Sequence, residues 1–374
     1  MTRDLYVCSF SLTLGNGRAL RTYTCVRALA MLGPLDLAYV SHDGADPCPE
    51  YLAIDGVVFH EIKPSRGARR ALVYGSKRIK AIPPACCRGT SLELIEESER
   101  LAGAPGRGRV IADDVNAATA LMPLARRRAV IYNAHNLESQ YPLGPGPRRA
   151  WSRLGMLRYE RNLLDLVGES WMVSRADMAS AQAIAPSAKL RYAPNVVDVR
   201  SVRPRRGEGP GNTLLMIGDF TYHPNRSARD FLVERILPLV RRSIADARVV
   251  LVGRGLEGWQ APTDGIEITG FVPDLATVYE RADCVVVPLT EGAGTPLKFV
   301  EALAYQMPVI ATPFAARGLE LTPEVHFREA ADAERFAAAV VEVMRDGAPA
   351  MAAEGRRLVE REYSIEKLAE CLAP

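Results

Sequence analysis

The sequence predicts an α/β protein made of two doubly wound, Rossmann-like domains that face a cleft. Three observations support this fold class. Short apolar runs alternate with helical patterns along the whole chain. A glycine-rich turn, Leu14–Arg18, joins the first apolar run to the first helical pattern. A segment rich in proline, glycine and charge at 202–211 separates two such series, and 374 residues are enough for two domains.

The N-terminal half opens with a strand, a turn, a helix and a second strand. These elements are expected at 5–12, 19–32 and 35–40, with the turn before the helix. Further strands are expected at 57–62, 110–111, 129–132 and 170–173, and helices at 90–102 and 150–165. This order is typical of a doubly wound domain.

The same alternation restarts after the linker. Strands are expected at 213–217, 248–252, 266–269, 284–288 and 309–311, and helices at 228–242, 275–281, 298–305, 331–345 and 349–372. We therefore divide the chain into an N-terminal domain (1–200), a linker (201–211), a C-terminal domain (212–355) and a C-terminal helix (356–374) that packs back toward the first domain. Mostly parallel sheets of this kind bind ligands at the carboxyl ends of their strands.

The composition is that of an ordinary globular protein, with 48% hydrophobic and 24% charged residues. No run of 18 apolar residues occurs, and the start Met1–Asp4 lacks an export-signal pattern, so we expect a cytoplasmic protein. The seven cysteines and five histidines show no metal-type spacing. A structural zinc site is therefore not expected.

Charge is unevenly distributed along the chain. Residues 1–210 carry 30 Lys and Arg against 20 Asp and Glu, whereas the remainder carries 17 against 24. The first part would favour an anionic partner, although a solvated arginine-rich surface explains the excess equally well. The basic segment Arg66–Lys80 could lie on the inner face of the plasma membrane or simply face water. No aromatic residues interleave its charges, so nucleic acid is not an expected partner.

The most informative stretch runs from Val286 to Thr312. Its loop contains Gly292, Gly294 and Thr295 and leads directly into a helix. Glycines let the backbone approach a ligand closely, and the free N–H groups of a helix start favour a phosphate. Lys298 in the first turn can add positive charge for a diphosphate, and Glu301 can accept hydrogen bonds from vicinal hydroxyls. An ordinary glycine turn with a solvated Lys/Glu face is the alternative.

This stretch resembles the donor-binding signature of the group 1 (family-four) retaining glycosyltransferases, which have the GT-B fold. Four further segments resemble the same family: 216–225, 236–238, 251–255 and 269–274. The resemblance implies that Glu301 binds the nucleotide ribose and that the 294–295 amides hold the diphosphate with Lys298. The full set of implied donor-binding residues is Gly17, Arg18, Gly218, Arg254, Phe271, Val272, Gly292, Gly294, Thr295, Pro296, Leu297, Lys298 and Glu301.

Two residues are candidates for catalysis. Segment 132–138 resembles the family's His-Asn-x-Glu motif, which implies that His135 meets a donor hydroxyl or the reacting region; a structural histidine is the alternative. The family's usual motif has two glutamates separated by seven residues, but Ala293 stands eight positions before Glu301. Glu291, ten positions before it, is our candidate for the missing sugar contact.

The resemblance implies a transferase that moves a sugar from a nucleotide-diphosphate sugar, bound by the C-terminal domain, to a hydroxyl acceptor bound by the N-terminal domain. The acceptor would be a lipid-linked glycan or a natural product. Retention of configuration is implied, with neither metal nor other cofactor, because the helix start, Lys298 and either Arg18 or Arg226 can neutralise the leaving group. The alternatives are a nucleotide-sugar epimerase and a catalytically silent nucleotide-sugar-binding partner.

Overall fold

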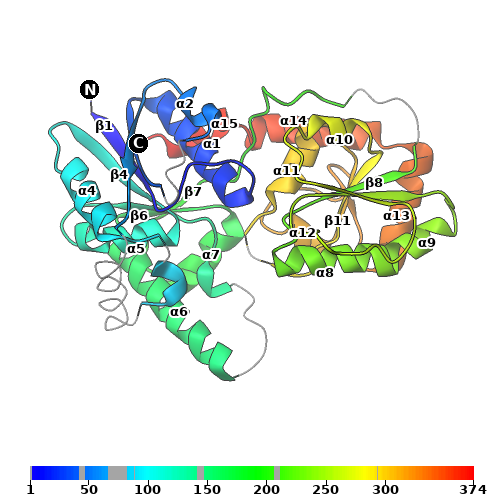
Figure 1. The fold of residues 1–374 in the computed structure, drawn as a ribbon, viewed down its shortest axis with the longest axis horizontal. Helices are drawn as coiled ribbons and strands as arrows, with labels where there is room; N and C mark the ends of the chain where they lie inside the picture. Colours follow the sequence, from blue (N-terminus) through cyan, green and yellow to red (C-terminus); the bar gives the residue numbers. More distant parts are fainter. Residues whose placement is uncertain are drawn as a thin grey trace. The chain divides into compact units, whose positions relative to one another are not determined.

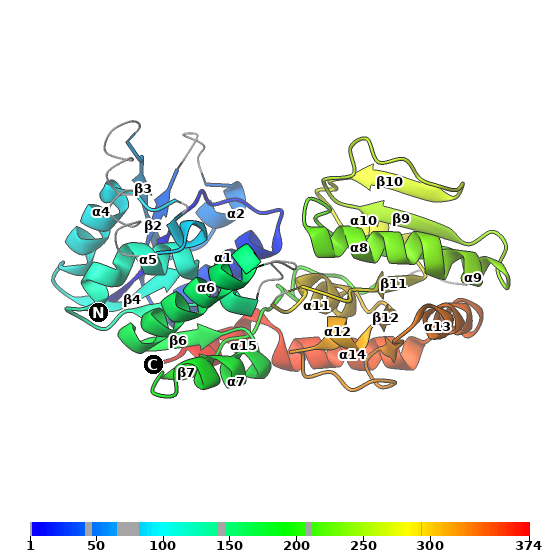
Figure 2. The same ribbon diagram turned by 90° about the horizontal axis from the view of Figure 1, so that it is seen from below.

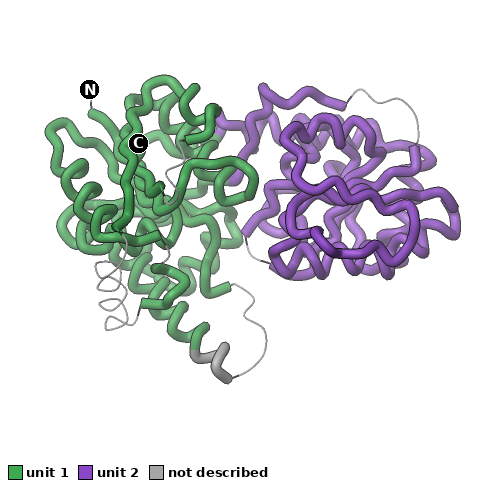
Figure 3. The backbone as a smooth tube through the Cα atoms, viewed as in Figure 1, with its two compact units in different colours: residues 1–194, 368–374 green, residues 195–367 purple. Residues whose placement is uncertain are grey.

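The structure is a computed structural model that describes residues 2–41, 47–65, 82–87, 89–140, 147–205, 211–292 and 294–374. It contains two compact units: unit 1 is Met1–Pro194 with Leu368–Pro374, and unit 2 is Asn195–Lys367 (Figure 3). The basic segment 66–80, residues 206–210 of the expected linker and Ala293 lie outside the described residues. The chain passes from unit 1 to unit 2 just before Asn195 and returns just before Leu368.

Unit 1 contains a sheet whose seven described strands all pair in parallel, in the order β3-β2-β1-β4-β5-β6-β7 (Figure 1). The strands are β1 (Arg3–Cys8), β2 (Leu35–Val40), β3 (Val57–Ile62), β4 (Arg107–Asp113), β5 (Ile131–Asn133), β6 (Glu169–Met172) and β7 (Leu190–Tyr192). The helices are α1 (Gly17–Leu32), α2 (Pro49–Leu52), α4 (Leu92–Ala102), α5 (Asp114–Ala125), α6 (Pro147–Leu166) and α7 (Arg175–Ile184).

Unit 2 contains a second parallel sheet, with its six described strands in the order β10-β9-β8-β11-β12-β13. The strands are β8 (Thr213–Ile217), β9 (Arg248–Val252), β10 (Ile266–Gly270), β11 (Cys284–Val287), β12 (Val309–Ala311) and β13 (Arg328–Glu329). The helices are α8 (His223–Phe231), α9 (Leu237–Arg241), α10 (Ala276–Glu280), α11 (Leu297–Ala304), α12 (Pro313–Ala316), α13 (Ala333–Asp346) and α14 (Pro349–Glu362), followed by α15 (Ile365–Leu372), which ends in unit 1.

Helices cover both faces of the unit 2 sheet. Helix α11 packs with α14, and α9 packs with α13 (Figures 1 and 2). Between them, β11 is buried along its whole length, and Phe299 of α11 packs edge-on against Phe327 at 5.3 Å between ring centroids. This arrangement is the doubly wound α/β architecture that the sequence predicts, and it is confirmed for both units.

Two expected helices differ in detail, and one observed helix was not expected. The expected helix 228–242 begins earlier, at His223, and contains a π-helical turn at Leu232–Ile236 before α9. Pro238 explains the interruption, because proline lacks an N–H and clashes with the preceding turn. The expected helix 349–372 is broken at Tyr363–Ser364, where Tyr363 and Ser364 pair with Val197 instead. Helix α5 was not predicted, since its residues are buried on nearly every side and show no amphipathic period.

Candidate functional site

The topology of each sheet points to one place where a ligand can bind. In open α/β sheets this place is the carboxyl edge at the position where the strand order reverses. In unit 2 the order reverses between β8 and β11, and in unit 1 between β1 and β4. Gly218 follows β8, and the loop 288–296 follows β11, so the reversal in unit 2 brings together the two stretches that the sequence singled out.

Lys298 lies against the turn that follows β8. Its Nζ donates a hydrogen bond to Oδ1 of Asn225 at 2.6 Å, and Nδ2 of Asn225 donates to the carbonyl oxygen of Asp219 at 2.7 Å. A Cβ atom added at Gly218 would lie 3.2 Å from the Asn225 side chain and 3.4 Å from Nζ of Lys298. The absence of a side chain at Gly218 therefore leaves room for the ammonium group of Lys298.

The charge of Lys298 is not compensated within the described residues. The side chain is half-buried, and it forms no ion pair with a carboxylate in the described part of the chain. Burial of the ammonium lowers the pKa of Lys298 to about 8. A partly desolvated cation with only an amide partner is a site that an anion would stabilise.

The start of helix α11 offers backbone donors beside this cation. Pro296 occupies the N-cap position, no side chain caps the first turn, and the first turn has no acidic residue. Two glycines of the preceding loop have positive φ angles, 141° at Gly292 and 70° at Gly294. Thr295 is buried, and its Oγ1 accepts a hydrogen bond from Nδ2 of Asn195 at 2.8 Å. The loop is thus held, and within the described residues no side chain caps the first turn. The N–H of Phe299 donates to the carbonyl oxygen of Pro296 at 2.9 Å, so the N–H groups of Leu297 and Lys298 are the ones left for a ligand.

Glu301 lies one turn further along α11, among aromatic side chains. The hydroxyl of Tyr279 donates to Oε2 of Glu301 at 3.5 Å, and the ring of Tyr279 stacks on that of Tyr305 at 4.1 Å between centroids. Burial raises the pKa of Glu301 to about 7, although the Tyr279 hydrogen bond opposes this shift. Among the described residues this carboxylate has one weak donor, so it can accept further hydrogen bonds from a ligand hydroxyl.

Two other predicted site residues in unit 2, Arg254 and Glu291, have partners within the protein. Arg254 forms a two-pronged pair with Oδ2 of Asp219, at 2.9 Å from Nε and 2.7 Å from Nη2. Glu291 accepts from Oγ of Ser227 at 3.0 Å and pairs with Nδ1 of His223 at 2.9 Å. Phe271 is 59% exposed, whereas Val272 packs partly against the core of unit 2. The sugar contact assigned to Glu291 stays a prediction.

In unit 1 the predicted residues gather at the reversal between β1 and β4. Gly17 begins helix α1, which Asn16 caps by accepting from the N–H of Ala19 at 2.9 Å. The guanidinium of Arg18 forms an ion pair with Asp114 and lies 3.7 Å from the ring centroid of Phe10. Asp114 has a positive φ of 65° at the end of β4. Arg18 is therefore held at this edge by a carboxylate and an aromatic ring.

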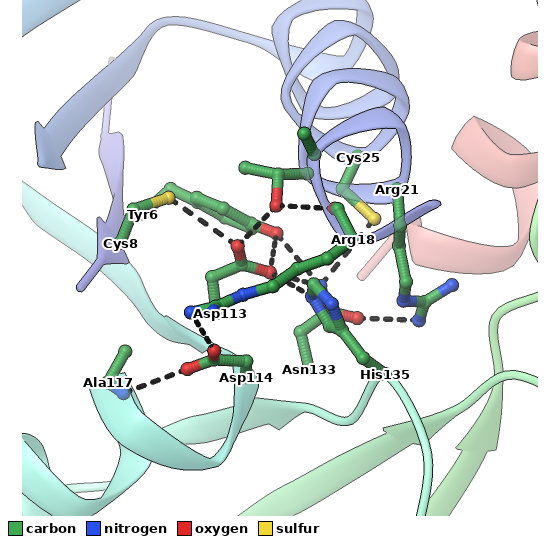
Figure 4. Close-up of polar contacts among 12 residues, drawn as sticks. Tyr6, Cys8, Arg18, Arg21, Cys25, Asp113, Asp114, Ala117, Asn133 and His135 are labelled. Atoms are coloured by element: carbon green, nitrogen blue, oxygen red, sulfur yellow. Dashed lines mark hydrogen bonds and ion pairs between the residues drawn. The ribbon is translucent and has the colours of Figure 1, made fainter. Parts of the chain in front are cut away.

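His135 follows β5 at the same edge, and it is paired. Its Nε2 lies 2.7 Å from Oδ1 of Asp113, the last residue of β4 (Figure 4). Only 12% of the His135 side chain is exposed, and Asp113 is completely buried. Nδ1 of His135 is buried and has no hydrogen-bond partner in the described part of the protein.

Comparison with known proteins relates the second half of the chain to a family. Residues 211–346 match the family model described as "Glycosyl transferases group 1". The chain is also 30% identical over 265 residues to a GDP-mannose-dependent alpha-(1-6)-phosphatidylinositol monomannoside mannosyltransferase of Mycobacterium tuberculosis. The described core of unit 2 is therefore similar to the group 1 glycosyltransferases. The alignment with the mycobacterial enzyme covers 61% of this chain and 66% of its relative, slightly less than two thirds of that protein.

Solved structures show that this chain has the GT-B fold. Sucrose-phosphate synthase from Thermosynechococcus elongatus superposes with a TM-score of 0.72 at 15% identity, over 99% of this chain and 97% of the other. HepE from Anabaena, solved with UDP and glucose, superposes with a TM-score of 0.68 at 12% identity, over 99% and 98%. Identities this low establish the fold alone.

The sequence interpretation missed three residues that lie in these sites. Asn225 contacts Lys298 across 73 positions of sequence, and Tyr279 contacts Glu301 across 22. Asp113 contacts His135 across 22 positions and was not among the candidate site residues. In the described residues no group of three His, Cys, Asp or Glu side chains is arranged to hold a metal ion. No helix in the described ranges is both long enough and apolar enough to cross a membrane.

Proposed function

We propose that this protein is a group 1 glycosyltransferase that transfers a sugar from a nucleotide-diphosphate sugar to a hydroxyl acceptor. The observation that carries the proposal is the environment of Lys298. Within the described residues its ammonium has no carboxylate partner, and it lies in the first turn of α11, where no side chain caps the helix, at the place in the unit 2 sheet where a ligand is expected. A pyrophosphate supplies the missing negative charge and accepts hydrogen bonds from the free N–H groups.

Glu301 supports the nucleotide part of the proposal. A carboxylate one turn beyond the diphosphate site lies about 4.5 Å further along a helix axis, three residues at 1.5 Å each. This spacing suits a ribose attached to the diphosphate, whose two hydroxyls can donate to one carboxylate. Relatives fit this chemistry: the mycobacterial enzyme is named for GDP-mannose, and HepE was solved with UDP and glucose.

For the reaction, we propose retention of configuration without a metal ion. The bond between the anomeric carbon and the diphosphate oxygen breaks, and negative charge collects on the leaving diphosphate beside Lys298. The acceptor hydroxyl attacks the same face of the sugar, forms the new glycosidic bond and gives its proton to the departing phosphate oxygen. Fixed positive charge at the leaving group then does what a divalent cation does in other transferases.

A two-stage experiment tests this proposal. Thermal-shift measurements compare UDP, GDP, TDP and ADP, each with and without magnesium, on the wild type and on Lys298→Met. We expect one diphosphate to stabilise the wild type irrespective of magnesium, and the variant to respond weakly. The matching nucleotide sugars are then incubated with lipid-linked and with water-soluble acceptors.

Each outcome of the second stage has a defined meaning. Transfer to an acceptor supports the proposal and identifies the acceptor class. Conversion of the nucleotide sugar to an epimer without any acceptor would replace the proposal with an epimerase. Tight binding with neither transfer nor epimerisation over the whole acceptor panel would make the chain a silent partner. A magnesium requirement would contradict the metal-free mechanism.

A further inference from the structure

The carboxylate of Asp113 accepts hydrogen bonds from several elements of unit 1. Its Oδ1 accepts from the Tyr6 hydroxyl at 2.6 Å, from Nδ2 of Asn133 at 2.8 Å and from Nε2 of His135 at 2.7 Å. Its Oδ2 accepts from the Thr22 hydroxyl at 2.6 Å. It also accepts from Sγ of Cys8 at 3.5 Å (Figure 4). Strands β1, β4 and β5 and helix α1 therefore all contribute to this cluster. So many donors on one buried carboxylate hold it in a single orientation.

This cluster keeps Asp113 ionised. Burial acts to raise the pKa of Asp113, but the hydrogen bonds that its carboxylate accepts from His135, Thr22 and Tyr6 favour the ionised form. Arg21, which is also buried, donates to Oδ1 of Asn133 at 2.6 Å. The negative charge of Asp113 therefore has a buried positive charge nearby, connected to it through the Asn133 amide.

An ionised Asp113 determines which nitrogen of His135 carries the proton. A carboxylate only accepts hydrogen bonds, so Nε2 of His135 must be the donor in the 2.7 Å contact. In neutral imidazole the other nitrogen is then an acceptor. That nitrogen, Nδ1, is the one that is buried without a hydrogen-bond partner among the residues that the structure describes.

We propose that Asp113 is a positioning residue, which fixes His135 as the Nε2–H tautomer so that Nδ1 faces the ligand as a hydrogen-bond acceptor. The group that meets Nδ1 must then donate a hydrogen bond, as a hydroxyl does. A phosphate oxygen, which is itself an acceptor, does not fit there. The tautomer is a property of the free protein, whereas the ligand contact rests on the function proposed above.

Asp113→Asn is a variant that the cluster can accommodate. The amide oxygen replaces Oδ1 and keeps the three donors on that side. The amide nitrogen replaces Oδ2 and donates to the Thr22 hydroxyl, which already has the carbonyl oxygen of Arg18 within reach at 3.1 Å as an alternative acceptor. The substitution removes the charge with little change in shape. Asp114→Asn, one residue later, is the matched control because no contact joins Asp114 to His135 in the described structure.

Nitrogen NMR of histidine-labelled protein tests the tautomer without substrate. We expect Nε2 of His135 to be protonated and Nδ1 to be unprotonated at neutral pH, with an Nε2 proton that exchanges slowly with water. Asp113→Asn should speed that exchange and shift both nitrogen signals, whereas Asp114→Asn should change them little. His60, whose Nε2 lies 2.9 Å from Oδ1 of Asp36, is an internal reference that neither variant should move. A protonated Nδ1, or identical His135 signals in wild type and Asp113→Asn, overturns the proposal.

Kinetics then test whether Asp113 acts through His135. In the wild-type background Asp113→Asn should lower kcat roughly 10- to 100-fold, with diphosphate affinity unchanged; this is at or below the roughly 100-fold lower end of what a positioned acid–base group contributes, because the substitution leaves His135 in place. In a His135→Gln background the same substitution should change kcat less than about 2-fold, because the partner is gone. Equal losses in both backgrounds would mean a purely structural Asp113 and would refute the proposal. If no nucleotide sugar is turned over, the proposed function fails, and the NMR result still decides the tautomer.

Discussion

The titration of Lys298 makes nucleotide affinity depend on pH. Burial lowers the pKa of Lys298 to about 8 in the free protein. Only the protonated ammonium attracts a diphosphate, so the affinity should fall as the pH rises through this value. Lys298→Met removes the titrating group, and Lys298→Arg keeps a positive charge at every accessible pH.

The size of the effect follows from the pKa. At pH 7 about 90% of the free protein carries the ammonium, and at pH 9 about 10% does, so the apparent dissociation constant should rise about 10-fold. Glu301, with a pKa raised to about 7, opposes this trend. Its ionised fraction rises from about one half to nearly one over the same range, which improves affinity at most about 2-fold. A net weakening of roughly 5- to 10-fold remains.

Isothermal titration of the intact nucleotide sugar at pH 7, 8 and 9 measures this change. Lys298→Met should bind weakly with little pH dependence, and it also reports any titration of the ligand itself. Lys298→Arg should depend less on pH than the wild type. Equal pH dependence in the wild type and in Lys298→Met would refute the assignment of Lys298 to the diphosphate.

Three further predictions concern the surroundings of this site. The pKa of Glu301 is raised above its unfolded value, so the protonated carboxyl stabilises the fold below about pH 4.5, and this stability is lost as the pH rises through about 7. Glu301→Gln should therefore raise Tm more at pH 8 than at pH 5. Equal Tm shifts at the two pH values would contradict this. Asn225→Ala removes the Lys298 partner and should weaken diphosphate binding several-fold by calorimetry, with unchanged affinity as the contrary result. Gly253→Ala places a Cβ 1.8 Å from the Gly218 carbonyl oxygen. Gly258 has a positive φ but open space around it, so Gly258→Ala should lower the free energy of unfolding by about 1 kcal/mol. Gly253→Ala should lower Tm by more than Gly258→Ala, and the reverse order would be inconsistent with the turn described.

The fold was predictable where local patterns decide it. Strands β8, β9 and β11 are continuous apolar runs because parallel strands are buried on both faces, and their expected bounds agree closely with the structure. Helix α5 escaped prediction for the opposite reason, since burial on nearly every side removes the amphipathic period. The π-helical turn before Pro238 depends on backbone geometry that no hydrophobic pattern records.

The candidate site was predictable only in part. A glycine loop entering a helix with Lys298 and Glu301 is a local pattern, and the sequence shows it. Asn225 is a tertiary partner 73 residues away, and the Asp113–His135 pair spans 22 residues and two strands. Such contacts depend on strand order, which brings β4 beside β5 and β8 beside β11. The partners of Glu291 also required the structure, because they come from α8.

The central claim is that Lys298 and the start of α11 hold a pyrophosphate. A crystal structure of the protein with the best-binding nucleoside diphosphate tests it most directly. We expect phosphate oxygens within hydrogen-bonding distance of Nζ of Lys298 and of the N–H groups at the start of α11, and ribose hydroxyls that donate hydrogen bonds to the carboxylate of Glu301. A diphosphate bound elsewhere, with Lys298 still paired only to Asn225, would contradict it.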